Sequence, residues 1–227
     1  MTRRQRPTLL LLIALTLTAA AARAQDAPVF DPGRIPAEGA RAQEFVPAGW
    51  KIEARADGDL DGDRRTDHVL HLVPGDHEST VSGAAPESHA LLILLSSEGG
   101  RLRRAALATR LLVQVAPQYS LELSIRNGVL VTNQNFGMTE VADLTHRFRY
   151  EPASGHFLLI GKDTFNYHRP QGPKWPATRV SENYLTGVRL TTTERWRGER
   201  QLKPLEKREQ IERTRTYIEE VNEDFNE

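Results

Sequence analysis

Aspartates at alternate positions form the stretch of this sequence whose spacing most directly indicates chemistry. Counted from Asp59, carboxylates stand at positions 1, 3, 5 and 9, as Asp59, Asp61, Asp63 and Asp67. Calcium takes about six to eight oxygen ligands in flexible geometry, so alternate aspartates on a curled backbone can turn several oxygens toward one ion. Gly62 permits the tight turn, and the carbonyl of Arg65 could supply a further oxygen. The spacing therefore predicts a calcium loop.

Three other interpretations of these aspartates stay open. Counting from Asp57 puts carboxylates and Gly62 where an EF-hand has them, but position 12 is then His68, where an EF-hand needs a bidentate glutamate. The strand-like residues that follow also replace the expected exit helix. Magnesium keeps its waters and seldom uses a cage made only of protein ligands. An acidic turn exposed to solvent, without an ion, is the remaining alternative.

The segment Gly58–Leu70 resembles the Asp-x-Asp/Asn-x-Asp-Gly-x-x-Asp-apolar signature of FG-GAP and VCBS-type repeats, the calcium-loop hairpins of integrin alpha-like β-propellers. The resemblance implies side-chain ligands from Asp59, Asp61, Asp63 and Asp67 and a carbonyl ligand from Arg65. The chain has Arg64 where the family usually has glycine, and it carries one copy of the motif. The resemblance therefore implies a metal hairpin, not a whole propeller. More loosely, the chain is similar to small exported bacterial proteins that carry one such loop.

Other groups of residues give weaker signals. His68, His71 and His77 lie close together in the sequence, but in a strand residues 68 and 71 point to opposite faces, so surface histidines are expected rather than zinc. The chain has no cysteine, no Gly-x-Ser-x-Gly elbow and no phosphate-binding glycine-rich loop. Binding is therefore better supported than catalysis.

Aromatic residues in and beside a proline-rich stretch could form a platform for a sugar or a peptide. They are Tyr167, Trp175, Tyr184 and Trp196. Ordinary packing of these rings onto a sheet is the alternative. A glycan or an envelope protein is the expected partner.

Short apolar or alternating runs with turn residues between them predict successive β-strands. The runs are Trp50–Ala56, Asp67–Val73, His89–Ser96, Leu102–Thr109, Tyr119–Arg126, Val129–Asn133, Leu144–Tyr150, Phe157–Lys162 and Tyr184–Trp196. Asn127-Gly128 tolerates positive φ and favours a tight type I′ hairpin. The pattern predicts a mainly β fold with little helix: an antiparallel sheet, a sandwich or a partial propeller-like piece.

The N-terminal residues have the order of a secretory signal peptide. Three early arginines precede the apolar run Leu9–Ala22, and Ala22-Arg23-Ala24 supplies a cleavage site before Gln25. The run is shorter than the roughly 20 residues of a membrane span. Removing the signal leaves 26 basic residues against 30 acidic ones, because four of the 30 basic residues lie within it. This balance gives no electrostatic footprint for nucleic acid.

The expected organisation is a signal peptide (1–24), a flexible leader (25–49), a β domain with the calcium loop (50–186) and a charged C-terminal arm (187–227). Long loops are expected at Pro74–Ser88 and Asn166–Thr178. The arm is interpreted as a charged hairpin over Gly187–Glu212, followed by a short helix or a tail.

Together these features predict an exported, periplasmic or secreted calcium-binding β domain with no membrane span after signal cleavage. It would serve as a binding or structural module at the cell envelope. The alternative from another class is an envelope hydrolase that acts on glycans.

Overall fold

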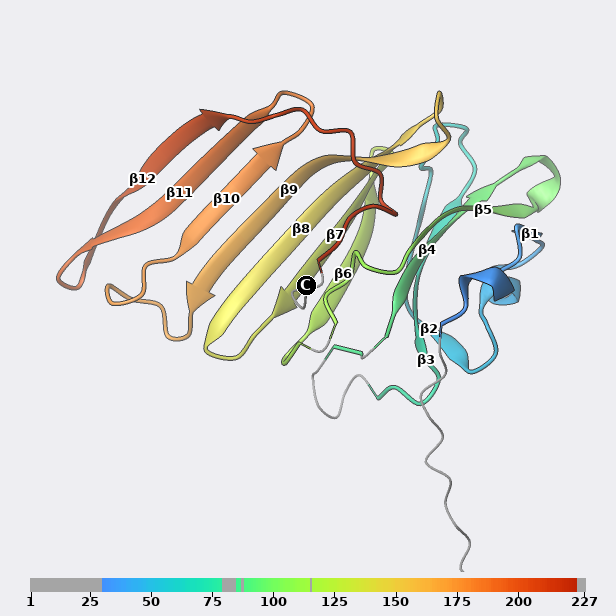
Figure 1. Ribbon diagram of the computed structural model, residues 1–227, viewed down its shortest axis with the longest axis horizontal. Coiled ribbons are helices and arrows are strands. Elements are labelled where there is room, and N and C mark those ends of the chain that lie inside the picture. The colour runs from blue at the N-terminus through green and yellow to red at the C-terminus, as the bar shows by residue number, and fades with distance from the viewer. Residues whose placement is uncertain (1–29, 79–84, 87, 115, 224–227) are drawn as a thin grey trace, which may run out of the picture.

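The computed structural model describes residues 30–78, 85–86, 88–114 and 116–223, and it is built from two antiparallel β-sheets (Figure 1). The sheets have five and seven strands and pack as a sandwich-like structure without a closed barrel. The predicted mainly β fold is confirmed. The expected signal peptide lies outside the described residues. No helix in the described part of the chain is long and apolar enough to cross a membrane.

The five-stranded sheet comes from the first half of the chain. In spatial order its strands are β1 (Glu38–Gly39), β5 (Leu102–Ala108), β4 (Ala90–Ser96), β3 (Asp67–Pro74) and β2 (Trp50–Gly58). A short 3-10 turn, η3 (Glu98–Gly100), joins β4 to β5. The central strand β4 is an unbroken apolar run because it is covered on both faces.

Residues 30–49 form the outer cover of this sheet, although they were expected to belong to a flexible leader. They contain two 3-10 turns, η1 (Pro32–Arg34) and η2 (Ala42–Phe45). Ile35 and Phe45 are buried against the outward-facing leucines of β3 and β4. The segment is rich in Ala, Pro and Gly with no period, so its packing role could not be read from its sequence.

The seven-stranded sheet follows the order of the chain from one edge to the other. Its strands are β6 (Ser120–Arg126), β7 (Val129–Phe136), β8 (Glu140–Glu151), β9 (His156–His168), β10 (Thr178–Asn183), β11 (Val188–Arg197) and β12 (Arg200–Gln210). Asn127 and Gly128 have φ values of 52° and 73°, which confirms the tight hairpin between β6 and β7.

Two expectations for this sheet were wrong. The predicted strand Tyr184–Trp196 begins only at Val188, as β11, because its first four residues, Tyr184–Gly187, form a turn, and the preceding strand β10 was not predicted. The side chain of Asn183 accepts a hydrogen bond from the Thr186 N–H in this turn, and Gly187 has a φ of 68°. The expected loop Asn166–Thr178 is also shorter, because β9 extends to His168 and β10 begins at Thr178. The charged hairpin is present as β11 and β12.

The segment after β12 runs back across the sandwich (Figure 1). Tyr217 forms a β-bridge with Leu158 of β9, and Ile218 and Val221 are buried in the core between the two sheets. In the described residues 211–223 this segment is a tail rather than a helix. Its apolar residues recur at three and four positions because they pack against the sheets, not because they share a helix face.

Candidate metal centre

The aspartate loop connects β2 to β3 at a point where the two sheets come together. A Cβ on Gly58, the last residue of β2, would lie 2.8 Å from the side chain of Ile125 on β6, so glycine permits this approach. Leu60 turns inward from the loop and is buried in the core between the sheets. The loop is therefore anchored by an apolar side chain between its acidic residues.

Two residues of the loop have a left-handed backbone. Gly62 has a φ of 86°, as expected for the residue that permits the turn, and Arg64 has a φ of 68°. Arg64 stands at the position where FG-GAP-like loops usually have glycine, and its N–H donates to Asp59 Oδ2 at 3.0 Å. The loop thus curls around the carboxylate of Asp59.

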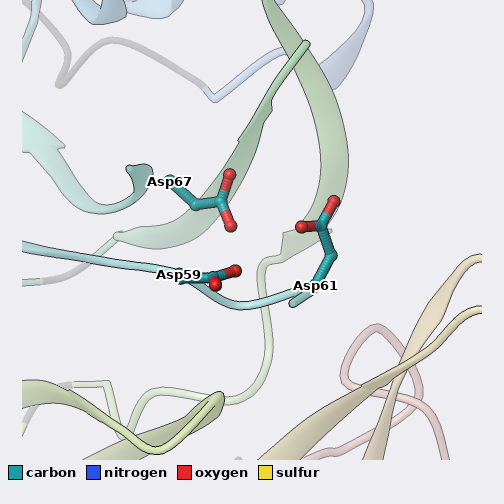
Figure 2. A group of neighbouring side chains, drawn as sticks. All are labelled: Asp59, Asp61 and Asp67. Carbon is teal, nitrogen blue, oxygen red and sulfur yellow. The ribbon is translucent and has the colours of Figure 1, made fainter. Parts of the chain in front are cut away.

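The structure brings together three of the predicted ligands: Asp59, Asp61 and Asp67. Each offers a carboxylate oxygen, and these oxygens all lie within 4.8 Å of one another. Figure 2 shows the three carboxylates turned toward a common space, two from the loop and one from the start of β3. Three converging carboxylates form a donor set that suits a hard cation such as calcium.

Asp67 is the most constrained of the three. It is completely buried, and its two oxygens accept backbone N–H groups from Leu60 and Ser96, each at 2.8 Å. Since Ser96 ends β4, the carboxylate ties the loop to two strands at once. Asp59 similarly accepts the N–H groups of Gly62 and Arg64.

The electrostatics of the group favour a bound cation. Burial, together with repulsion from Asp63 and Asp59, raises the pKa of Asp61. Burial also raises the pKa of Asp67, to which the charges of Asp61 and Asp63 add, although its two backbone hydrogen bonds oppose the shift. A cation among these groups would relieve both effects.

Asp63 and Arg65 are oriented differently from the three clustered aspartates. Asp63 accepts the Arg65 N–H at 2.8 Å and pairs with the Arg65 guanidinium at 2.5 Å. Its side chain is therefore directed to Arg65, while it still raises the pKa of Asp61. That Asp63 and the carbonyl of Arg65 are metal ligands remains a prediction.

The EF-hand register is not the one adopted by the described residues. Asp57 lies at the end of β2, where its Oδ1 contacts Arg55 at 2.6 Å and His68 at 2.7 Å. These contacts hold Asp57 apart from the clustered carboxylates, and a strand follows the loop where an EF-hand has a helix.

His68 and His71 point to opposite faces of β3, as strand geometry predicts, but the expectation of surface histidines is wrong for His71, which is buried. His68 pairs with Asp57, whereas His71 lies on the other face of β3 and contacts His89, with 3.1 Å between His71 Nε2 and His89 Nδ1. His89 is nearly fully buried, as is His71. Burial lowers the pKa of His71 to about 3 and that of His89 to about 4, so both are neutral at pH 7. This pair could not be predicted from local sequence patterns, because its members are 18 positions apart.

A second buried polar cluster was also missed. Glu223, in the tail, accepts hydrogen bonds at its Oε1 from His146 Nε2 at 2.9 Å and from Lys162 Nζ at 2.6 Å. Burial by itself would raise the pKa of Glu223, but these two partners hold it below its ordinary value. Burial lowers the pKa of His146. Lys162 is thus the cation that balances the Glu223 carboxylate.

The four aromatic residues do not form one platform. Tyr167 stacks on Phe165 at 5.0 Å, and Trp175 stacks on His168 at 4.5 Å. Tyr184 donates a hydrogen bond to Glu182. Trp175 is the most exposed of the four, at 47%.

The chain was compared with protein families, curated proteins and solved structures, and no match was found in any of the three comparisons.

Proposed function

We propose that this chain is an exported β domain that binds one calcium ion and serves as a binding or structural module at the cell envelope. The observation that carries the proposal is the convergence of the Asp59, Asp61 and Asp67 carboxylates. The left-handed backbone at Arg64, where FG-GAP-like loops usually have glycine, adds support for a loop of that kind.

Calcium fits this donor set better than other common metals do. The clustered donors are all oxygens, which zinc uses less than nitrogen and sulfur. They sit on an irregular loop, and calcium tolerates irregular geometry better than magnesium does. Asp59, Asp61 and Asp67 would hold the ion, with Asp63 and the Arg65 carbonyl as further candidate ligands. The bound ion would supply positive charge that offsets the repulsion among the carboxylates.

The role proposed for the ion is structural. Both oxygens of Asp67 are held by backbone N–H groups from the loop and from β4, and Leu60 fixes the loop in the core. An ion bound here would fasten β2, β3 and β4 at one point. The chain has no cysteine, so a metal would do the work that disulfides do in many exported domains.

The glycan hydrolase alternative gains no support from the described residues. Such enzymes need two carboxyl groups facing each other across a cleft, roughly 5–10 Å apart. In the described part of the chain the carboxylates that converge most closely are those of Asp59, Asp61 and Asp67, and Asp67 is wholly buried rather than facing a cleft. The binding role is therefore the proposal.

Calcium titration followed by thermal melting tests the metal site. Protein treated with EDTA should gain about 5–10 °C in Tm when calcium exceeds its Kd by about 100-fold, and should gain less with magnesium. Asp61→Asn should abolish most of this gain, because it removes a charge from the cluster. Asp76→Asn, an exposed aspartate after β3, is the matched control and should keep the full gain.

The metal proposal fails if millimolar calcium leaves the Tm unchanged, or if Asp61→Asn retains the full response. Export is tested separately. When the full sequence is expressed in a bacterium, the protein should be recovered outside the cytoplasm with Gln25 as its first residue. Recovery of uncleaved protein in the cytoplasm would contradict this part of the proposal.

A further inference from the structure

A cavity of about 430 Å³ lies at the end of the seven-stranded sheet where β7 ends and β8 begins, away from the aspartate loop. Its floor is the inner face of β8, β9 and β10, and the loop of residues 169–177 forms one side. Residues that line it include Phe136, Glu140, Ala142, Asn166, His168 and Thr178. A volume of this size is typical of sites for small molecules, about 300–1,000 Å³.

The strand register places the polar groups of the cavity in adjacent rows. Ala142, Asn166 and Thr178 are directly opposite one another on β8, β9 and β10. Glu140 and His168 form the next pair toward the strand ends, with 3.6 Å between Glu140 Oε1 and His168 Nε2. A carboxylate, an imidazole, an amide and a hydroxyl are therefore presented from one surface.

The backbone of this floor is already paired. β8, β9 and β10 are interior strands, each with a neighbour on both sides. One way in which an extended peptide recognises a sheet is to add a strand to a free edge, and the floor of this cavity has no free edge. A ligand in this cavity would therefore contact side chains rather than unpaired backbone groups.

The side chains that line the cavity match the chemistry of a sugar ring. The amide of Asn166 and the carboxylate of Glu140 are planar polar groups, and the hydroxyl of Thr178 can donate and accept. Phe136, Ala142 and Pro176 contribute apolar surface beside them. A pyranose ring has hydroxyls at its rim and C–H groups on its faces, so it can use both kinds of contact.

One residue that lines the cavity, His168, is stacked on a neighbouring ring outside the lining. His168 and Trp175 stack at 4.5 Å with an angle of 17° between their planes, and Lys174 Nζ lies 5.3 Å from the Trp175 ring centre. The stack fixes the orientation of the imidazole that faces the cavity. Within the lining, Glu140 and His168 give one acidic group and one neutral or basic group, so no strong charge of one sign selects an ion.

We propose that this cavity binds one or two hexopyranose rings of a neutral glycan. Asn166, Thr178 and Glu140 would contact the ring hydroxyls, and Phe136 and Pro176 would contact its apolar C–H groups. This inference deepens the binding role proposed above by naming a ligand class, but it does not require the calcium site.

Titration with defined oligosaccharides tests the inference. The probes are chitotetraose, maltotetraose and cellotetraose, with glycerol and tetra-alanine as controls, followed by calorimetry and by tryptophan fluorescence. At least one tetrasaccharide should bind saturably, with a Kd below about 10 mM, and should change the fluorescence because Trp175 stacks on His168, which lines the cavity. Asn166→Ala and Thr178→Val should each weaken this binding about tenfold or more. Thr191→Val, the same change on the same face but outside the cavity, should leave it unaltered.

Three results would overturn the inference: no saturable binding of any tetrasaccharide up to 10 mM, equal affinity in the Asn166→Ala and Thr178→Val variants, or saturable binding of tetra-alanine that depends on Asn166. The titrations are repeated with Asp61→Asn in EDTA, which should still bind the sugar. Sugar binding without a calcium response, or the reverse, separates the failure of one proposal from the failure of the other.

Discussion

The two halves of the seven-stranded sheet share one register but differ in what covers them. One cross-strand row shows the change: Gln134, Leu144, Thr164, Val180, Thr191 and Lys207 stand side by side from β7 to β12. Gln134 and Leu144 are buried, Thr164 and Thr191 are partly exposed, and Lys207 is exposed. The register continues unchanged from β7 to β12, but the layer that covers the inner face does not extend over β10 to β12.

This difference shows that the presence of a covering layer, rather than the strand itself, determines whether the inner face carries apolar or polar residues. Over β7 to β9 the five-stranded sheet and the tail bury Leu130, Phe148 and Leu159. Over β10 to β12 the same inner face is rich in threonine and charged residues, which remain compatible with a strand when one side meets water. The covered half should hold the fold together, whereas the inner face of the open half contributes less to stability.

The largest expected effect contrasts two phenylalanines. Phe148 is fully buried in the covered half, so Phe148→Ala should lower the free energy of unfolding by about 3–5 kcal/mol. Phe165 is only partly buried on the opposite face, beneath the Arg179 guanidinium at 4.4 Å. Phe165→Ala should cost about 1 kcal/mol. Urea denaturation measures both, and equal losses would contradict the contrast between the covered inner face and the uncovered opposite face of the sheet.

The next effect concerns the boundary between the two halves. Glu223→Ala should lower the free energy of unfolding by about 2–4 kcal/mol, because it leaves His146 and Lys162 without their shared partner in a buried setting. Glu212→Ala, in the same segment but exposed, is the control and should cost less than about 0.5 kcal/mol. If both variants unfold at the same urea concentration, the Glu223 contacts of the tail do not stabilise the covered half.

Acid should weaken the five-stranded layer that covers this half, through two buried histidines, one on β3 and one directly before β4. His71 and His89 have folded pKa values of about 3 and 4, both below the ordinary value of 6.5. The unfolded chain therefore binds more protons between pH 6.5 and about 4, so stability is complete above pH 6.5 and falls as the pH drops through this window. Each histidine should cost about 2 kcal/mol at pH 5.

Urea denaturation at pH 7.5 and pH 5.0 measures this loss. His89→Gln should be less stable at pH 7.5 but should lose less on acidification than the parent protein. His156→Gln is the control, because the side chain of His156 is half exposed. An unchanged loss in His89→Gln would show that other groups cause the acid sensitivity.

The smallest expected effect lies in the open half. Thr191→Val replaces a hydroxyl with a methyl group on a partly exposed β11 position, so the free energy of unfolding should change by less than about 0.5 kcal/mol in either direction. A loss above 2 kcal/mol, measured by urea denaturation, would mean that this face is covered in solution.

Local signals in the sequence were enough to predict most of the strands. Asn127-Gly128 identified its hairpin because both residues tolerate positive φ, and the aspartate spacing brought Asp59, Asp61 and Asp67 together as predicted. The turn at Tyr184–Gly187 was missed although Asn183 and Gly187 are typical turn residues, because the threonines after it suggested one continuous strand.

Contacts between distant residues could not be predicted. Glu223 and His146 are 77 positions apart, and nothing in the charged tail distinguishes Glu223 from its neighbours. The cavity also depends on pairing between residues of different strands. Asn166 and Thr178 flank a proline-rich loop, and they become neighbours only through the β9–β10 register, which the sequence did not reveal.

The buried tail also sets an order for folding during synthesis. Strands β2 to β5 leave the ribosome long before Ile218 and Val221, which pack against them. Until that late segment arrives, the apolar surface beneath it faces solvent, and such surfaces bind chaperones or neighbouring chains. The core can therefore close only after nearly all of the described chain has been made.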